Sequence, residues 1–330
     1  MERGDSFSGM KTPTIRATFA VAAVLAMAAM PAYLPAQAPA GTTLDDSLPS
    51  GANYALATFR LWLPSDAAQI RAALILMPGS NGDGRGEVVD TVWQNFAIKH
   101  HLALVGVQLT DKPHDQGFIE DYADVARGSG QALLDALDDF ARSSHHPELA
   151  GAPLLLWGMS AGGEFNYEFN AWKPDRVIAF VVNKGNIYYH ALVSRAAREV
   201  PGMLFTGGKD LEYRINTIKG LFAVNRRGAA LWAWAEEPGV GHVVGKSRDV
   251  ALDFFEDVLP MRLGNATPAA DGSVALRALD EHTGFLGDYA TLTFKPMGAG
   301  RAPGVPTAWL PTERVARAWQ AMVSGQTVER

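Results

Sequence analysis

A ten-residue stretch in the middle of the chain constrains its fold more than any other. Four apolar residues at 154–157 are followed at once by Gly158-Met159-Ser160-Ala161-Gly162 and then by residues with helical spacing over 164–169. This order predicts a buried strand, a tight turn and a helix. Glycines fit at both ends of the pentapeptide, because the strand and helix backbones pass close together there and leave no room for a β-carbon. We therefore expect Ser160 to project from the carboxyl end of a sheet, with a helix N-terminus behind it.

The bulk composition fits a globular protein and excludes several classes of function. The chain has 330 residues, of which 48% are hydrophobic and 19% are charged, so it can bury a large core. Its formal net charge is −6, and we expect no nucleic-acid partner because it lacks a basic footprint. The chain contains no cysteine, which excludes disulfides, thiolate metal sites and a cysteine nucleophile. Hydroxyl chemistry remains as the covalent option.

The N-terminal 40 residues have the pattern of a secretory signal peptide. Lys11 and Arg16 precede an apolar run over residues 17–30, and small residues with prolines follow. The pattern predicts signal-peptide cleavage near residue 38 or 40 and a secreted or periplasmic protein. The run is short and alanine-rich for a membrane span, so we expect no stable membrane insertion after cleavage. Residues 41–53, which are rich in Gly, Ser, Thr and Pro, are interpreted as a flexible leader.

Apolar strand patterns alternate with helical patterns through the rest of the chain. Strands are predicted over residues 54–63, 71–77, 102–107, 154–157, 177–182, 203–206 and 230–235. Helices are predicted over residues 88–98, 122–142, 191–198, 215–224 and 247–259. This alternation predicts an α/β fold in which a mostly parallel, doubly wound sheet is covered by helices on both faces. We expect the catalytic domain over residues 54–262, followed by a small C-terminal extension over 263–330 that packs on the core and contains a short strand at 289–294 and a helix at 311–322.

Two further polar residues follow later strands and complete a pattern with Ser160. A serine is a weak nucleophile until a base removes its proton, and that base is usually a histidine oriented by a carboxylate. Asp210 follows the strand at 203–206, and His242 follows the strand at 230–235. In a doubly wound sheet both loops lie at the same carboxyl edge as the serine. Glu212 is a rival for the acid, but we favour Asp210 because it is nearer to the end of its strand.

The loop after the strand at 71–77 supplies candidate backbone donors. Residues 79–86 are rich in glycine but lack the Gly-Lys-Ser/Thr ending of a phosphate-binding loop. We predict that the amides of Ser80 and Ala161 form an oxyanion hole, with Asn81 as a candidate substrate-binding residue. Lys184 and Asn186 follow the strand at 177–182, at the same edge, and either bind substrate or cap their loop.

With these elements in order, the chain resembles the α/β-hydrolase superfamily, in particular its secreted bacterial serine esterases and depolymerase-like members, over roughly residues 54–260. The resemblance implies that Ser160 is the nucleophile, His242 the base and Asp210 the acid. It also implies that the oxyanion hole is formed by the amides of Ala161 and Ser80. The order Ser, Asp, His along the chain is the order of this superfamily.

These observations predict a serine hydrolase that cleaves carboxylic ester bonds through an acyl-enzyme intermediate. We expect its substrate to be a small-molecule or polymeric ester, and we expect no cofactor and no metal. A peptidase or a thioesterase would use the same three residues. A non-catalytic binding module built on a hydrolase scaffold is an alternative of another class.

Overall fold

The computed structural model describes residues 39–117, 119–266, 268–270, 272–298 and 307–326. The predicted signal peptide, residues 1–40, therefore lies almost entirely outside the described residues. In the part of the chain that is described, no helix is both long enough and apolar enough to cross a membrane.

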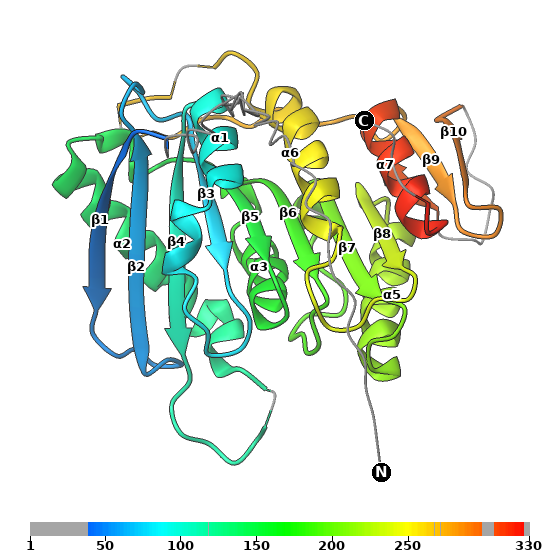
Figure 1. Ribbon diagram of the computed structural model, residues 1–330, viewed down its shortest axis with the longest axis horizontal. Coiled ribbons are helices and arrows are strands. Elements are labelled where there is room, and N and C mark those ends of the chain that lie inside the picture. The colour runs from blue at the N-terminus through cyan, green and yellow to red at the C-terminus, as the bar shows by residue number, and fades with distance from the viewer. Residues whose placement is uncertain (1–38, 118, 267, 271, 299–306, 327–330) are drawn as a thin grey trace, which may run out of the picture. The chain divides into compact units, whose positions relative to one another are not determined.

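An eight-stranded sheet with the order β1-β2-β4-β3-β5-β6-β7-β8 forms the centre of the fold (Figure 1). The strands are β1 (Gly41–Leu48), β2 (Leu56–Pro64), β3 (Ala72–Met77), β4 (Leu102–Thr110), β5 (Leu154–Gly158), β6 (Val177–Asn183), β7 (Gly202–Gly207) and β8 (Trp232–Glu237). β2 is antiparallel to β1 and β4, and the pairs from β4 through β8 are parallel. The continuous apolar runs of β3, β5 and β6 are buried along their whole length, as expected for strands covered on both faces.

Helices cover both faces of this sheet. They are α1 (Thr91–His100), α2 (Ser129–Ser144), α3 (Ala161–Trp172), α4 (Arg195–Arg198), α5 (Glu212–Arg227), α6 (Ser247–Leu263) and α7 (Glu313–Val323). Leu133 of α2, Phe165 of α3 and Leu221 of α5 belong to one apolar core. Trp93 of α1 and Phe254 of α6 belong to the other, and Figure 1 shows α1 and α6 in front of the sheet. The predicted mostly parallel, doubly wound sheet is confirmed.

Two helices begin at least four residues later than the sequence pattern predicts. The helix predicted over 122–142 starts only at Ser129, because Gly128 has a φ of 142°, which is incompatible with a helix. Short 3-10 turns at Asp121–Ala123 and Val125–Arg127 precede it. The helix predicted over 191–198 is reduced to α4, whose first turn is capped by the side chain of Ser194.

The prediction of a flexible leader over residues 41–53 is wrong, because Gly41–Leu48 forms the edge strand β1. Most of this strand is partly or fully exposed, so its sequence lacks the apolar alternation that identifies a strand. Asn53, which ends the predicted leader, is buried at 2% exposure. Its side-chain amide donates to the carbonyls of Asp121 and Asp124 at 2.9 and 2.8 Å. The segment is therefore part of the folded core.

A small three-stranded sheet and α7 make up the C-terminal extension. Its strands are β9 (Phe285–Asp288), β10 (Thr293–Pro296) and β11 (Ala308–Leu310), in the order β10-β9-β11. The strand predicted at 289–294 is mostly a turn between β9 and β10. Nε1 of Trp319 and the hydroxyl of Tyr289 both donate to the carbonyl of Trp234 in β8, at 2.8 and 2.9 Å. The extension thus covers the edge strand β8, whose backbone groups would otherwise be unpaired.

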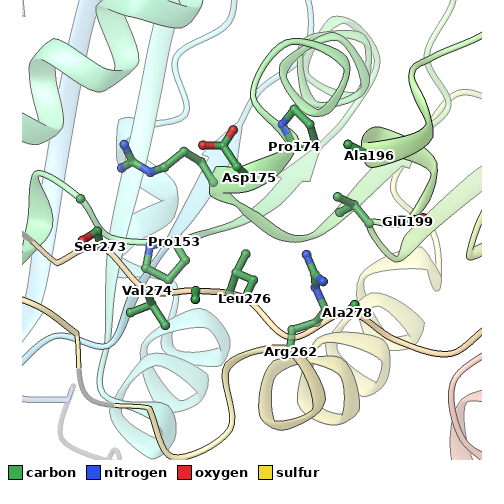
Figure 2. Close-up of a pocket in the computed structure, with 14 residues that line it drawn as sticks. Pro153, Pro174, Asp175, Ala196, Glu199, Arg262, Ser273, Val274, Leu276 and Ala278 are labelled. Atoms are coloured by element: carbon green, nitrogen blue, oxygen red, sulfur yellow. The ribbon is translucent and has the colours of Figure 1, made fainter.

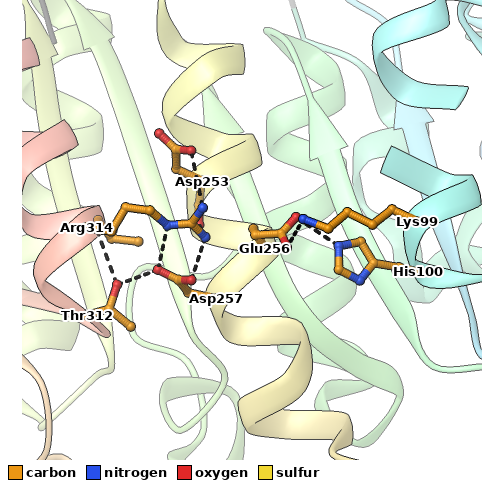
Figure 3. A network of polar contacts seen from close by, with 8 residues as sticks. Lys99, His100, Asp253, Glu256, Asp257, Thr312 and Arg314 are labelled. Atoms are coloured by element: carbon orange, nitrogen blue, oxygen red, sulfur yellow. Dashed lines mark hydrogen bonds and ion pairs between the residues drawn. The ribbon is translucent and has the colours of Figure 1, made fainter. Parts of the chain in front are cut away.

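Charged side chains on α6 connect it to both neighbouring helices (Figure 3). Asp257 accepts hydrogen bonds from the guanidinium of Arg314 on α7. The preceding residue, Glu256, contacts Nζ of Lys99 at 2.6 Å and Nε2 of His100 at 2.8 Å, both on α1. Surface ion pairs contribute about 0–1 kcal/mol each, so these contacts add little to the stability of the fold.

Candidate active site

Ser160 lies in the tight turn between β5 and α3, with φ 53° and ψ −124°. A non-glycine residue in this region costs on the order of 1–3 kcal/mol and persists only where the surroundings hold it. Here its amide donates to the carbonyl of Asn183 at 2.8 Å. A β-carbon on Gly158 would lie 2.2 Å from the carbonyl oxygen of Gly162, and one on Gly162 would lie 2.4 Å from that of Met77. The predicted need for both glycines is confirmed.

The structure brings together the three side chains that the sequence pattern selects. Nε2 of His242 lies 3.0 Å from Oγ of Ser160, and Nδ1 of His242 lies 2.7 Å from Oδ2 of Asp210. Asp210 follows β7 and His242 follows β8, so the contacts join loops at neighbouring carboxyl ends of the sheet. This arrangement can pass a proton from the serine to the imidazole while the carboxylate holds the ring in orientation.

Both carboxylate oxygens of Asp210 have partners within the protein. Its Oδ1 accepts from the amide of Leu211 at 2.8 Å and lies 3.3 Å from Nη1 of Arg214. Burial opposes ionisation, but the hydrogen bonds from His242 and Leu211 outweigh it and, with the charge of Arg214, lower the pKa of Asp210 below its ordinary value. The carboxylate is therefore charged at neutral pH. Glu212, the rival acid, is the first residue of α5 and is exposed.

Ala161 and the loop that contains Ser80 lie next to Ser160 in the structure. Ala161 is the first residue of α3, where a backbone N–H has no partner within the helix. A β-carbon on Gly79 would lie 3.6 Å from Cβ of Ser160, so the loop that carries Ser80 runs along the serine. The assignment of the amides of Ala161 and Ser80 as the oxyanion hole remains a prediction.

Asn81 already has partners within the protein. Its side-chain Oδ1 accepts a hydrogen bond from the backbone amide of Asp111 at 2.7 Å. Its backbone N–H donates to the hydroxyl of Tyr122 at 3.1 Å. Its φ is 52°. These contacts tie the loop beside Ser160 to the end of β4. The structure thus gives Asn81, a candidate substrate-binding residue, a role in shaping the loop.

Lys184 and Asn186 are buried, at 1% and 5% exposure. Nζ of Lys184 donates to the carbonyl of Val244 at 3.3 Å, within the loop of His242. The backbone amide of Asn186 donates to Oε1 of Glu164 at 2.6 Å. Of the two roles that the sequence left open, these contacts favour the one that holds a loop over direct binding of substrate.

Two buried carboxylates near the site were not selected by sequence reasoning. Glu164, in the first turn of α3, is 1% exposed, and burial together with the charge of Glu120 raises its pKa to about 8. Glu237, the last residue of β8, is 6% exposed. Glu164 follows the predicted serine turn and Glu237 follows the predicted strand at 230–235, so their position at the sheet edge of Ser160 was the available signal.

A cavity of about 420 Å³ lies at the opposite edge of the sheet (Figure 2). Pro153 and Pro174, which precede β5 and β6, are among its lining residues, together with Arg262 at the end of α6 and Leu276. Ser160 instead follows the carboxyl end of β5. This cavity is therefore not the substrate site of the serine.

The sequence matches no family model and no curated protein. Solved structures are similar at low identity. A ferulic acid esterase shares 12% identity over 66% of this chain and 97% of its own, with a TM-score of 0.48. A poly(3-hydroxybutyrate) depolymerase from Bordetella parapertussis shares 15% over 71% and 93%, with a TM-score of 0.49. The S-formylglutathione hydrolase of Staphylococcus aureus shares 14% over 66% and 97%, with a TM-score of 0.44.

The chain's own topology identifies the fold. The strand order around the sheet, the antiparallel β2 and the strained serine turn between β5 and α3 occur together. His242 after β8 contacts the serine, and Asp210 after β7 contacts His242, so the three residues follow the chain order Ser, Asp, His. The chain has the α/β-hydrolase fold, with a small additional sheet at its C-terminus.

Proposed function

We propose that the protein is a serine hydrolase that cleaves carboxylic esters. The observation that carries this proposal is the continuous contact from Asp210 through His242 to Ser160, at 2.7 and 3.0 Å. A serine with this pair of neighbours is activated as a nucleophile, because the imidazole accepts its proton and the carboxylate stabilises the imidazolium that results.

The reaction proceeds in two halves. Oγ of Ser160 attacks the ester carbonyl while His242 takes its proton, and the amides of Ala161 and Ser80 stabilise the oxyanion by about 3 kcal/mol per donor. The tetrahedral intermediate collapses, the C–O bond to the alcohol breaks, and His242 returns the proton to the leaving oxygen. Water then attacks the acyl-enzyme with His242 as base, and the acid is released from Ser160.

The substrate class that we propose is a small-molecule or polymeric ester. A peptidase or a thioesterase would use the same three residues, and only a substrate panel separates these chemistries. The pattern of the N-terminal 40 residues favours action outside the cytoplasm, in the periplasm or the medium.

Labelling by a fluorophosphonate, beside hydrolysis of p-nitrophenyl esters of increasing chain length, tests the proposal on the chain beginning at Gly41. We expect one label per chain and ester turnover, both lost in Ser160→Ala and in His242→Ala. Ser143→Ala, on the exposed side of α2, is the matched control and should behave as the wild type.

Three results would redirect the proposal. Labelling that persists in Ser160→Ala would contradict the assignment of the nucleophile. A labelled serine without ester turnover would indicate a peptidase or a thioesterase. A folded wild-type protein that is neither labelled nor active would support a binding module.

A further inference from the structure

A buried lysine connects the loop of His242 to the strand beside Ser160. Lys184 follows β6, has a φ of 58° and is 1% exposed. Its Nζ donates to Oδ1 of Asn183 at 3.2 Å and to the carbonyl of Val244 at 3.3 Å, and lies 3.6 Å from Oε2 of Glu237. An ammonium has three N–H donors, and here three acceptors from three segments surround it.

Each of these contacts leads to a residue of the candidate site. The carbonyl of Asn183 accepts the amide of Ser160, so the lysine contacts the residue that fixes the serine backbone. Val244 is two residues beyond His242 in the same loop. Lys184 therefore connects Asn183, which binds the backbone of Ser160, to the loop that carries His242.

The loop of His242 is fixed on both sides of the histidine. Two residues before it, the carbonyl of Val240 accepts the amide of Lys209 at 2.8 Å. Two residues after it, Val244 is bound by Lys184, and the next contact is the amide of Lys246, which donates to Oε1 of Glu237 at 2.9 Å. The second attachment thus combines the buried pair formed by Lys184 and Glu237 with Ser247, whose hydroxyl also donates to the carbonyl of Val244.

The backbone passes close to this pair at two glycines. A β-carbon on Gly207 would lie 3.0 Å from Cε of Lys184 and 2.5 Å from the carbonyl oxygen of Gly241, next to His242. Gly245, with a φ of 58°, passes so close to Glu237 that a β-carbon would lie 2.2 Å from Oε2. The two glycines let the loop close directly onto the charged pair.

We propose that Lys184 and Glu237 are positioning residues for His242, which hold its loop so that the imidazole reaches Ser160 and Asp210 together. The inference rests on the proposed function, because it assigns the pair a role in the same reaction. Burial lowers the pKa of Lys184, and the charges of Glu237 and Asp210 oppose that shift. Both side chains are buried, at 0% and 8% exposure.

The test replaces both charges at once. Lys184→Met alone would leave a buried carboxylate whose Oε2 has no hydrogen bond among the described residues, and such an unpaired charge is strongly destabilising. The double variant Lys184→Met/Glu237→Gln removes this penalty, and glutamine retains an acceptor oxygen for the amide of Lys246. The matched control is Lys219→Met/Glu236→Gln, the same chemical change at a neighbouring ion pair of 3.3 Å that is partly exposed.

We expect the double variant at Lys184 and Glu237 to lower kcat for p-nitrophenyl acetate by roughly 10- to 100-fold, because a catalytic group displaced by about 1 Å loses up to this factor. KM should stay within about twofold, since no binding contact is removed. The rate of fluorophosphonate labelling should fall by the same factor as kcat. The control pair should leave all three quantities unchanged.

A folded double variant with the kcat and labelling rate of the wild type would overturn the proposal, and so would a rise in KM at constant kcat. If the double variant does not fold, Glu237→Gln alone decides, because it keeps the volume and removes the negative charge while Nζ of Lys184 retains Oδ1 of Asn183 and the carbonyl of Val244 as acceptors. It should lower kcat at constant KM, and an unchanged kcat would overturn the inference. Failure of the proposed function is seen separately, as a wild-type protein that is not labelled at Ser160.

Discussion

Oδ2 of Asp210 lies 2.7 Å from Nδ1 of His242, on the opposite side of the imidazole from Ser160. A carboxylate accepts hydrogen bonds but does not donate them, so this contact places the ring proton on Nδ1. Nε2 is then free to accept the serine proton. The orientation and the tautomer of the base thus follow from one hydrogen bond to the carboxylate of Asp210.

Replacement of this carboxylate by an amide should disable the base while leaving the fold intact. Asp210→Asn offers Nδ1 an amide of nearly the same shape, which can donate and thereby favour the wrong tautomer. We expect kcat for p-nitrophenyl acetate to fall by about 10⁴-fold. Glu212→Gln, the same chemical change two residues later on an exposed side chain, should leave kcat unchanged. If the larger loss occurred in Glu212→Gln, the acid would be Glu212 instead.

The serine turn also makes a prediction for stability. Gly162→Ala would place a β-carbon 2.4 Å from the carbonyl oxygen of Met77, and backbone cannot yield there without separating α3 from β3. We expect several kcal/mol of lost unfolding free energy, or no folded protein, in urea titrations. Gly220→Ala, on the exposed face of α5 with nothing within 4 Å of the added carbon, should instead stabilise by about 0.5–1 kcal/mol. Equal effects would refute the close approach at Gly162.

The elements that were predicted correctly can be recognised from the residue pattern of the segment itself. The strand β3 is apolar throughout because both of its faces are buried, and that pattern is visible without the rest of the chain. β1 could not be recognised, because it is a mostly exposed edge strand that exists through its pairing with β2. Local pattern likewise could not separate β9 from β10, since a turn with Leu292 at a φ of 53° divides them.

The same distinction applies to the candidate site. Ser160, Asp210 and His242 each follow a strand, so their order and the shared sheet edge were enough to select them. The sequence places Lys184 at the carboxyl edge of the sheet but does not predict its contacts. Its partner Glu237 is 53 positions further along the chain and reaches it only through the packing of two loops. The roles of the three selected residues remain predictions that the experiments above test.

Glu164 predicts a pH dependence of stability. Burial and the charge of Glu120 raise its pKa to about 8 from an ordinary value of 4.5, so the folded state binds the proton more tightly than the unfolded state. Its contribution to stability is complete below about pH 4.5 and is lost as the pH rises through about 8. A glutamine at position 164 cannot ionise and can still accept the hydrogen bond from the backbone amide of Asn186.

We therefore expect Glu164→Gln to gain unfolding free energy relative to the wild type as the pH rises from 5 to 9, by on the order of a few kcal/mol at the upper end. Urea titrations across this range measure the difference. Glu212→Gln, at an exposed position, should give a curve parallel to that of the wild type. A parallel curve for Glu164→Gln would mean that the buried carboxyl is ionised throughout.

Exposed apolar side chains next to the triad predict how activity depends on the length of the ester. Leu211 follows Asp210 and is 52% exposed, Tyr213 is 49% exposed, and Val243 follows His242 and is 58% exposed. An acyl chain that extends from Ser160 across these loops can cover them, and each buried methylene contributes about 0.8 kcal/mol.

The triple replacement of these three residues by serine should lower kcat/KM for p-nitrophenyl octanoate by roughly tenfold or more, which corresponds to about 1.4 kcal/mol. Hydrolysis of the acetate should stay within about twofold, because its acyl group is too short to reach beyond the oxyanion hole. Val224→Ser, at an exposed valine of α5, is the control and should change neither value. Equal losses on both esters would show that the substitutions disturb Asp210 and His242 themselves, and no loss on octanoate would place the acyl chain on another side of the serine.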